Sequence, residues 1–180
     1  MRELSLHILD IVQNSIAAEA EIIRLAIKED EQNNQLTIKI ADDGCGMTAE
    51  EQQAVIDPFV TSRETREVGL GLPLLKEAAK QSAGSFQLSS QPGEGTTVVA
   101  EFEYDHIDRA PLGDMVGTIT TILNSNPDLE LVYRHQVGKQ EFVFDTREIK
   151  EELAGVAINN RQILNWLQGY LTERLAELRR

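Results

Sequence analysis

Two glycine-rich stretches hold the residues of this chain that are best suited to binding a ligand. In the segment IADDGCGM, Asp42 and Asp43 end an alternating apolar stretch and directly precede two glycines. A second glycine pair, in GLGL at 69–72, opens an apolar helical pattern. Free main-chain N–H groups at a helix start attract phosphate, and glycine lets a main chain approach a ligand closely. The two stretches together indicate a nucleotide pocket.

The carboxylate of Asp42 is the candidate for reading a base. A carboxylate beside a tight turn can accept a hydrogen bond from an exocyclic amine such as N6 of adenine. Gly44 and Gly46 allow main-chain angles that a Cβ would forbid, and Met47 follows them. A calcium loop is excluded, because DDGCGM lacks the alternating acids and the distant glutamate of an EF-hand. Taken alone, DDG is also a common turn.

Asp10 and Asn14 are polar residues within an amphipathic helical pattern over residues 3–19. Residues four apart lie on one face of a helix. The amide oxygen of Asn14 could ligate Mg²⁺, a cation that takes oxygen ligands and borrows phosphate oxygens. Asp10 could orient or deprotonate a water or hydroxyl near a γ-phosphate. Considered one at a time, Asn14 is better explained as an ordinary exposed or capping asparagine than as a metal ligand. Asp10 is likewise better explained as a solvated helix charge than as a base.

Hydrophobic periodicity predicts the elements that must position these residues. Thr48 is expected to cap a short helix, with Glu51 in the capping-box position. The predicted helices cover 3–19, 48–56 and 70–81, and the predicted strands cover 21–28, 35–40, 85–90 and 96–104.

This order predicts an α+β fold, a two-layer α/β sandwich whose mixed sheet is covered by helices on one face. A doubly wound parallel sheet fits worse, because the strands come in hairpin pairs and no G-x-G-x-x-G follows the first strand. A P-loop is excluded, because the chain has no G-x-x-x-x-G-K-[ST].

Four motifs, taken together, resemble the nucleotide-binding boxes of one superfamily. The segments LDIVQNSIAA, IADDGCGM, DPFVTSRETREVGLGL and GEGTTV are similar to the N, G1, F/G2 and G3 boxes of the GHKL ATPases. That superfamily includes gyrase, Hsp90, histidine kinases and MutL-type proteins. The resemblance covers residues 4 to 104, in the family's order and with family-like spacing. It implies the Bergerat fold and a site for ATP and Mg²⁺.

The resemblance also implies a role for each matching residue. Asn14 would ligate Mg²⁺, Asp42 would read adenine, and Thr96 would support the adenine end. Residues 61–68 would form a short ATP lid, where Arg63 or a second arginine, Arg66, could reach the γ-phosphate; a solvated loop charge explains either arginine equally well. The expected cofactor-binding residues are Asn14, Asp42, Gly44, Gly46, Met47, Thr61, Arg63, Gly69, Leu70, Gly71, Leu72 and Thr96.

The residue four positions before the N-box asparagine bears on mechanism. In the hydrolases and serine kinases of the superfamily this residue is typically glutamate, which acts as general base; in many histidine kinases it is asparagine or histidine. Here it is Asp10, which is acidic but one methylene shorter. Asp10 is therefore the expected catalytic residue, and it favours a competent base over a plain histidine kinase.

The acceptor of the phosphate is expected on another molecule. The N-box helix starts at residue 3, so no dimerising hairpin with a phosphoacceptor histidine is expected ahead of it. His7, one turn before Asp10 on that helix, is better explained as a structural residue, and His106 and His135 have no acceptor-like context. Three functions stay open: an ATPase or protein kinase acting on a partner in trans, similar to the anti-sigma serine kinases; the catalytic half of a split histidine kinase; and an ATP-responsive binding module without turnover. The sequence also leaves a homodimer open.

Composition limits the partners, the disulfide bonds and the cellular location that we expect for this protein. A net charge of −13 over 180 residues argues against nucleic acid or an anionic membrane as a partner, because both are bound through clustered Lys and Arg. The one cysteine, Cys45, allows no internal disulfide. The chain has no secretory signal and no apolar run long enough to span a bilayer, so we expect a cytoplasmic protein.

The last third of the chain resembles no family that its residues allow us to name. The segment DHIDRAP at 105–111 breaks the periodic pattern, so we predict an ATP-binding domain over 1–104 and a small unit over 105–180. For the aromatic residues Trp166 and Tyr170, packing against a hairpin is a commoner explanation than a partner surface. An αββαα order is predicted, with helices at 112–123, 146–153 and 161–178 and strands at 129–137 and 140–145.

Overall fold

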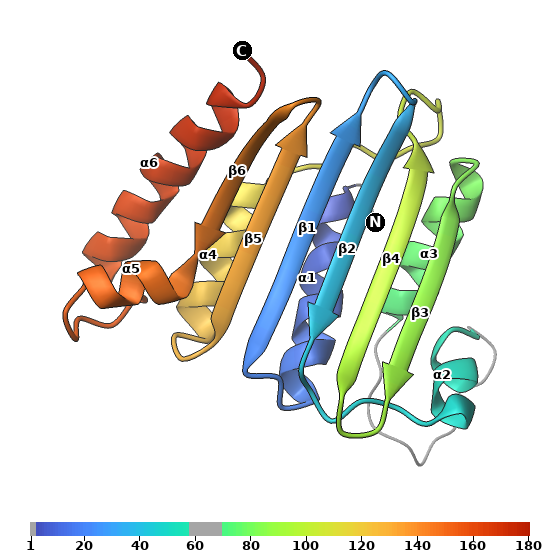
Figure 1. Ribbon diagram of the computed structural model, residues 1–180, viewed down its shortest axis with the longest axis horizontal. Coiled ribbons are helices and arrows are strands. Elements are labelled where there is room, and N and C mark those ends of the chain that lie inside the picture. Colours follow the sequence, from blue (N-terminus) through green and yellow to red (C-terminus); the bar gives the residue numbers. More distant parts are fainter. Residues whose placement is uncertain (1–2, 58–69) are drawn as a thin grey trace.

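A computed structural model describes residues 3–57 and 70–180. Its centre is one mixed sheet of six strands in the order β3-β4-β2-β1-β5-β6 (Figure 1). The strands are β1 (Ile22–Asp30), β2 (Gln35–Asp42), β3 (Ser85–Gln91), β4 (Gly95–Glu103), β5 (Glu130–Val137) and β6 (Gln140–Asp145).

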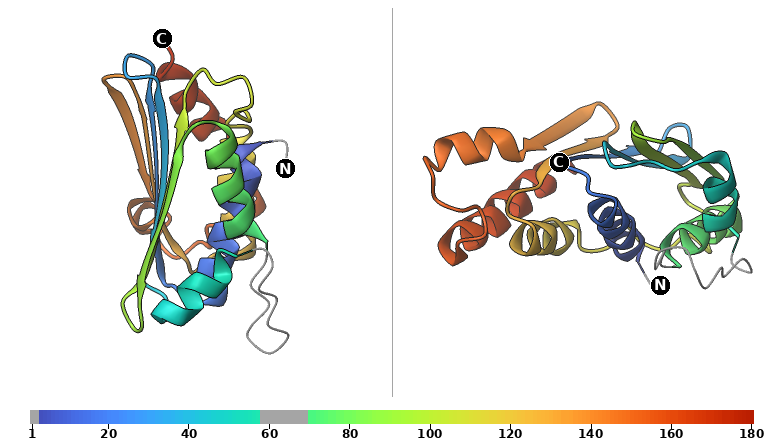
Figure 2. Two further views of the ribbon diagram at one scale, coloured as in Figure 1. Left: turned by 90° about the vertical axis from the view of Figure 1, so that its right-hand side faces the viewer. Right: turned by 90° about the horizontal axis from the view of Figure 1, so that it is seen from below.

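Helices cover only one face of this sheet. Figure 2 shows α1, α3, α4 and α6 on the same side of the strands, and no helix of residues 3–57 or 70–180 covers the opposite face. The helix α2 lies near the end of the β3–β4 hairpin (Figure 1). The helices are α1 (Leu4–Ala17), α2 (Ala49–Val55), α3 (Gly71–Gln81), α4 (Met115–Ser125), α5 (Thr146–Glu152) and α6 (Arg161–Glu177). The predicted α+β sandwich is therefore confirmed.

Alternation along the strands explains why the sheet has one covered face. In β1, Ile23, Leu25 and Ile27 are buried, whereas Arg24, between the first two, and Lys28, after the third, are exposed. Successive side chains of a strand point to opposite faces, so the apolar set of β1 faces the helices and the charged set faces solvent.

The strand pairing joins distant parts of the chain. Three antiparallel pairings link β1 to β2, β2 to β4 and β4 to β3, whereas β1 pairs in parallel with β5. A parallel pair needs a long connection, and here that connection includes β2, β3, β4 and α4. β1 is therefore an inner strand, and β6 pairs with β5 at the far end of the sheet.

The predicted αββαα order of residues 105–180 is present as α4-β5-β6-α5-α6. Its strands extend the sheet formed by the earlier part of the chain, and its buried Leu131, Tyr133 and Leu167 belong to the same core cluster as Leu4 and Ile8. The division into two domains near residue 105 stays a prediction.

Local caps set several helix ends. Thr48 accepts a hydrogen bond from the main chain of Glu51 and donates its own N–H to the Glu51 carboxylate, which is the predicted capping box. The helix α4 begins three residues later than predicted, because the carboxylate of Asp114 caps it by accepting from Gly117 at 2.8 Å. None of the described helices is both long and apolar enough to cross a membrane.

A cluster of polar residues connects the segment directly after α6 to the sheet. The carboxylate of Glu29 on β1 accepts hydrogen bonds from Arg179 at 2.7 Å and from the hydroxyl of Tyr104 at 3.2 Å, and it lies 2.8 Å from Nε2 of His135 on β5. The other ring nitrogen of His135 lies 2.7 Å from the hydroxyl of Tyr133. Polar atoms are buried here with partners, so they can stabilise the contact between α6 and the sheet.

Candidate functional site

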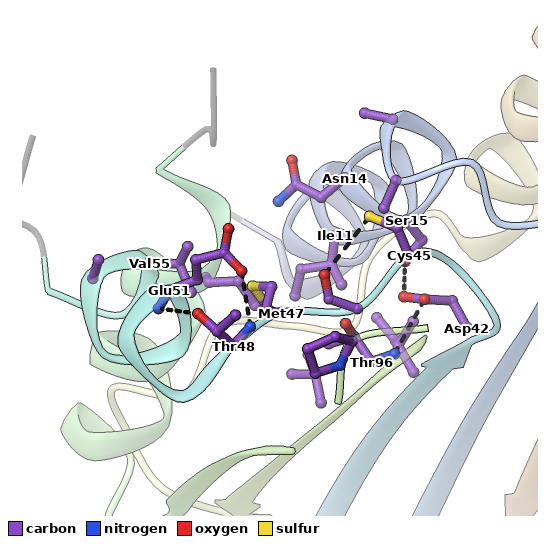
Figure 3. A pocket seen from close by; sticks show the side chains of 18 residues that line it. Ile11, Asn14, Ser15, Asp42, Cys45, Met47, Thr48, Glu51, Val55 and Thr96 are labelled. Atoms are coloured by element: carbon purple, nitrogen blue, oxygen red, sulfur yellow. Dashed lines mark hydrogen bonds between the residues drawn. The ribbon is translucent and has the colours of Figure 1, made fainter. Parts of the chain in front are cut away.

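A cavity of about 550 Å³ opens between α1, α2 and the ends of β2 and β4 (Figure 3). Its volume lies within the range of about 300–1,000 Å³ typical of small-molecule sites. Polar residues from α1, β2 and β4 meet in it: Asn14, Ser15, Asp42 and Thr96. The cavity is therefore formed by residues that lie far apart in the sequence and are brought together by the sheet.

Asp42, at the end of β2, is held by three hydrogen bonds. Its Oδ1 accepts from the main-chain N–H groups of Gly44 at 2.9 Å and Thr96 at 3.2 Å. Its Oδ2 accepts from the hydroxyl of Ser15 at 2.6 Å. The three donors come from the following turn, from β4 and from α1, so they fix the orientation of the carboxylate from three sides. Figure 3 shows the bonds from Ser15 and Thr96.

A second network orders the floor of the cavity beside Thr96. The hydroxyl of Ser90 on β3 accepts from the main chain of Met47 at 2.8 Å and lies 2.9 Å from Oγ1 of Thr96. It also lies 2.9 Å from the carbonyl oxygen of Gly95, to which it donates. Because Met47 follows the glycine turn, this network couples that turn to the β3–β4 hairpin.

The turn after β2 has no room for side chains at its two glycines. Gly46 has a φ of +68°, and a Cβ there would meet the carbonyl oxygen of Gln91 at 1.8 Å. A Cβ at Gly44 would lie 2.8 Å from the carbonyl oxygen of Ala18. Glycine is therefore required at both positions for the turn to pack between α1 and the β3–β4 hairpin.

Asp43 fixes the same region from outside the cavity. One of its carboxylate oxygens accepts from the main chain of Glu21 at 2.9 Å and of Ile22 at 2.8 Å. These are the residues at which β1 begins. Of the two adjacent aspartates, Asp42 points into the cavity, whereas Asp43 holds the start of the neighbouring strand.

Asp10 and Asn14 lie one turn apart on α1, next to the start of α3. A Cβ added to Gly71 would lie 2.9 Å from the Cβ of Asp10 and 3.7 Å from its Oδ2, so α1 and α3 approach closely at this point. No hydrogen bond or ion pair from another residue in 3–57 or 70–180 reaches the Asp10 carboxylate, which leaves it able to accept one from a ligand.

The structure places the expected site residues in three groups. Asn14, Asp42, Gly46, Met47, Leu72 and Thr96 line the cavity. Asp10, Gly44, Leu70 and Gly71 lie beside it without lining it; Leu70 immediately precedes α3 and is 61% exposed. Thr61, Arg63 and Gly69 lie outside the described residues, as does Arg66, so their roles stay predictions.

The sequence analysis missed several lining residues. Ser15 follows Asn14 directly, but its reach to Asp42 depends on how α1 lies against the sheet. The apolar walls could have been found from periodicity, because Ile40 and Val98 occupy the inward positions of β2 and β4. The missed lining residues that carry side-chain bulk or polarity are Ile11, Ser15, Ile40, Cys45, Thr48, Glu51, Val55, Pro92 and Val98.

Asn14 offers a fit for a magnesium ion. Its Nδ2 is buried without a hydrogen-bond partner among the described residues. The two amide atoms exchange places by a simple flip, so Oδ1 can take the same position. The described residues contain no cluster of three or more His, Cys, Asp or Glu that could hold a metal. One protein oxygen, completed by phosphate oxygens and water, is a habitual arrangement for Mg²⁺.

Known proteins resemble this chain in sequence. The sensor-like histidine kinase SenX3 of Mycolicibacterium smegmatis is 33% identical over 95 residues, which are 50% of this chain and 25% of SenX3. The sensor histidine kinase ZraS of Escherichia coli is 28% identical over 90 residues, 50% of this chain and 19% of ZraS. The sensor kinase/phosphatase LuxQ of Vibrio parahaemolyticus is 34% identical over 87 residues, 44% of this chain and 10% of LuxQ. This chain thus spans a quarter or less of each.

A solved structure shares the fold. The N-terminal domain of a DNA repair protein superposes with a TM-score of 0.53 at 14% identity, covering 79% of this chain and 52% of that one. At this identity the likeness concerns the fold alone.

A family model supplies the assignment. The model for histidine kinase-, DNA gyrase B- and HSP90-like ATPases matches residues 2–106, the stretch that contains Asp10, Asn14, Asp42 and Thr96. More than half of the chain therefore matches this family, and its relatives include histidine kinases. The chain belongs to the histidine kinase-, DNA gyrase B- and HSP90-like ATPase family and is an ATP-binding, kinase-like module.

Proposed function

We propose that this protein binds Mg-ATP in the cavity between α1, α2 and β4 and transfers or hydrolyses the γ-phosphate, with Asp10 as general base and the acceptor on another molecule. The observation that carries the proposal is the position of Asp10. It lies one turn from Asn14 on α1 and directly against Gly71 at the start of α3. A base, a candidate metal ligand and a helix N-terminus are therefore adjacent.

The adenine would lie at the Asp42 end of the cavity. Oδ1 of Asp42 already accepts two hydrogen bonds, from Gly44 and Thr96, whereas Oδ2 accepts one, from Ser15, and has capacity for a further donor. The apolar side chains of Ile40 and Val98 would contact the faces of a planar base. We infer that Asp42 reads the exocyclic amine, and that its three internal donors hold the carboxylate ready to do so.

The phosphates would lie toward the start of α3. Its first residues, Gly71 and Leu72, carry main-chain N–H groups with no partner inside the helix, and the helix dipole favours negative charge there. Leu72 lines the cavity, so this helix end faces the same space as Asp42. Asn14 would hold Mg²⁺, which when bound neutralises phosphate charge and orients the phosphates.

Asp10 would then act on the attacking group. Its carboxylate has no hydrogen-bond partner among the described residues, so it can accept a proton from a water or from an acceptor hydroxyl. Its side chain is one methylene shorter than that of glutamate, and the close approach of α3 at Gly71 brings the phosphate-binding helix toward it. We propose that this close packing compensates for the shorter reach.

A second candidate function is favoured by the named relatives. SenX3, ZraS and LuxQ are described as sensor kinases, and this chain matches only a part of each. The chain could thus be the ATP-binding half of a histidine kinase whose acceptor histidine lies on another polypeptide. The acceptor would then be an imidazole and not a water or hydroxyl, and Asp10 would have no proton to remove from a neutral ring nitrogen that attacks through its lone pair.

Replacing Asp10 by Asn separates these functions. The variant should bind ATP with wild-type affinity in calorimetry, because Asp10 does not line the cavity, and it should lose phosphate release and labelling of hydroxyl acceptors from γ-labelled ATP. Labelling of a histidine acceptor would persist. Equal turnover in wild type and variant would exclude Asp10 as base. ATP binding by the wild type with neither hydrolysis nor labelling would instead identify a binding module without turnover.

Asp42→Ala provides the matching test of the binding site. Loss of the carboxylate removes the proposed contact to adenine, so calorimetry should detect no Mg-ATP binding while circular dichroism stays unchanged. Asp43→Ala is the control, since Asp43 is adjacent in sequence but faces the start of β1. Unchanged ATP affinity in Asp42→Ala would refute the assignment of the adenine end.

A further inference from the structure

The strand β6 is an open edge of the sheet. It pairs with β5 and with no other described strand. Figure 1 shows it at the side of the sheet remote from α2. An edge strand carries a row of main-chain N–H and C=O groups that another strand can pair with.

The register of β5 shows which groups of β6 face outward. Gly138, directly after β5, donates its main-chain N–H to Glu29 on β1. Alternate residues of β5 therefore face β1, and Val137, His135 and Tyr133 face β6, where they pair with Gln140, Phe142 and Phe144. The residues between these, Glu141 and Val143, direct their N–H and C=O groups away from the sheet.

This edge has few of the features by which proteins usually protect an edge. The strand reads QEFVFD and contains neither proline nor lysine. Phe142 and Phe144 are buried on the helix face, whereas Val143 is 46% exposed on the open face. No hydrogen bond from another described residue reaches the main chain of Glu141 or Val143. The edge is therefore apolar at its centre and open to pairing.

The helix α6 extends beyond this edge and forms a groove with it. Figure 1 shows α6 lateral to β6, and Figure 2 places it in the helix layer. The groove has a volume of about 440 Å³. Its apolar lining comes from Phe142 and Val143 of β6, Tyr170 of α6 and Leu178 directly after α6, and its polar lining from Gln140, Glu141, Arg174 and Glu177. A strand added beside β6 would have α6 directly beneath it.

An aromatic stack on α6 lies at this position. Trp166 is 52% exposed and stacks on Tyr170 with ring centroids 5.2 Å apart. Tyr170 in turn meets Phe142 edge to face at 6.0 Å. The expected packing against the hairpin therefore holds for Tyr170, whereas Trp166 presents a large, half-exposed ring. Exposed tryptophan beside a groove is typical of binding hot spots.

We propose that β6 and α6 together bind an extended segment of a partner protein, which adds to the sheet as a seventh strand. Main-chain hydrogen bonds to Glu141 and Val143 supply pairing, and apolar side chains at alternate positions of the segment enter the groove toward Trp166 and Tyr170. On the open face the segment lies beside Glu141 and Asp145, whose carboxylates are already paired with Arg134 at 3.4 Å and Arg147 at 2.6 Å. The preference for a basic segment therefore comes from the net charge of −13 on the chain as a whole.

A second copy of the chain fits this surface less well. It would bring its own α6 into the layer beneath the joined strands, which the first α6 already occupies. A second copy would also carry the same net charge of −13, so the two chains repel each other. An extended segment without a helix on that side meets neither obstacle.

The test uses the full chain and a displayed library of random peptides. We expect selection to enrich peptides in which apolar residues alternate with basic ones. An enriched peptide should bind at least about tenfold more weakly to Trp166→Ala, which removes the exposed ring, and to Val143→Pro, which removes an outward N–H. The control Ile107→Ala alters a residue that is 94% exposed and does not line the groove, and it should bind like wild type.

Two further measurements identify strand addition itself. N-methylation of alternate peptide residues should abolish binding while the side chains stay the same, and bound peptide should slow amide hydrogen exchange at Glu141 and Val143. ATP affinity, which these variants should leave unchanged, verifies their fold and is independent of the peptide. Failure to enrich any peptide, or binding that survives N-methylation or both variants, would overturn the proposal. So would self-association of the chain that Val143→Pro abolishes, because a second copy would then occupy the edge.

Discussion

The hydroxyl of Ser15 donates a 2.6 Å hydrogen bond to Oδ2 of Asp42, across 27 residues of sequence. Ser15 is 4% exposed and lies on α1 next to Asn14, whereas Asp42 ends β2. This bond joins the helix that carries the proposed base and metal ligand to the carboxylate proposed to read adenine. The bond therefore links the two ends of the proposed nucleotide site directly.

Replacing Ser15 by Ala should weaken ATP binding. A hydrogen bond to a charged group contributes about 1.5–3 kcal/mol. Without this bond the Asp42 carboxylate is less well oriented for adenine, so part of that energy should be lost from ATP binding. We expect binding to weaken by about 1–2 kcal/mol, or about five- to thirtyfold in affinity. Calorimetric titration with Mg-ATP measures this. Ser82→Ala is the control: Ser82 is 2% exposed and bonds Ala78 within α3, away from the cavity. Equal losses in both variants would contradict the specific role of Ser15.

Replacing Gly71 by Ala should reduce turnover. The added Cβ would lie 2.9 Å from the Cβ of Asp10, so α1 and α3 must move apart. A displacement of about 1 Å can cost about a hundredfold in rate, and steady-state phosphate release should fall by about tenfold or more.

Gly169→Ala is the matched control for Gly71→Ala. Gly169 lies inside α6 with nothing within 4 Å of an added Cβ. Alanine favours the helix by about 0.8–1 kcal/mol over glycine, so this variant should gain stability in urea denaturation and keep full turnover. Undiminished turnover in Gly71→Ala would show that the contact with Asp10 does not constrain the chemistry.

Glu29 should make stability depend on acidic pH. Burial raises the pKa of this carboxyl, but hydrogen bonds from His135 and Tyr104 and the charges of Arg179 and His135 outweigh burial and lower the pKa below its ordinary 4.5. The unfolded chain therefore takes up the proton first as pH falls. The stabilisation is complete above about pH 4.5 and is lost below it.

The variant Glu29→Gln tests this pH dependence. It should be about 2 kcal/mol less stable at neutral pH, because hydrogen bonds to a charged acceptor are lost, and its free energy of unfolding should fall less steeply below pH 4.5. Urea denaturation at several pH values measures both. The exposed Glu173 gives a matched control as Glu173→Gln. If the free energy of unfolding of Glu29→Gln fell with pH as steeply as that of the wild type, Glu29 would not be the group that causes this pH dependence.

His7 should make the stability of the protein depend on pH at milder acidity than Glu29 does. It is 3% exposed, its Nδ1 has no partner among the described residues, and burial lowers its pKa from 6.5 although Asp10 opposes the shift. The unfolded chain binds this proton first, so the stabilisation is present above pH 6.5 and declines as pH falls below it. His7→Leu should flatten the stability curve below about pH 6.5. Identical curves for wild type and variant would exclude His7 as the titrating group.

Local features of the site could be predicted from the sequence because they depend on residues close in the chain. The capping box of Thr48 and Glu51 spans three residues, and the alternation of Ile23, Leu25 and Ile27 identifies a strand without reference to its neighbours. The turn at Gly44 and Gly46 can be predicted from its glycines alone. The main-chain atoms that leave no room for side chains there belong to distant residues, at the end of α1 and in the β3–β4 hairpin.

Pairing between distant segments could not be predicted in the same way. The sequence by itself determined the order of helices and strands, the motifs around Asn14 and Asp42, and the family they resemble. Only the tertiary structure decided that β5 lies parallel to β1, that Ser15 reaches Asp42, and that α6 extends beyond β6. The physical reason is that alternation shows which face of a strand is buried but not which strand lies beside it, since that choice depends on how the helices pack over the whole sheet.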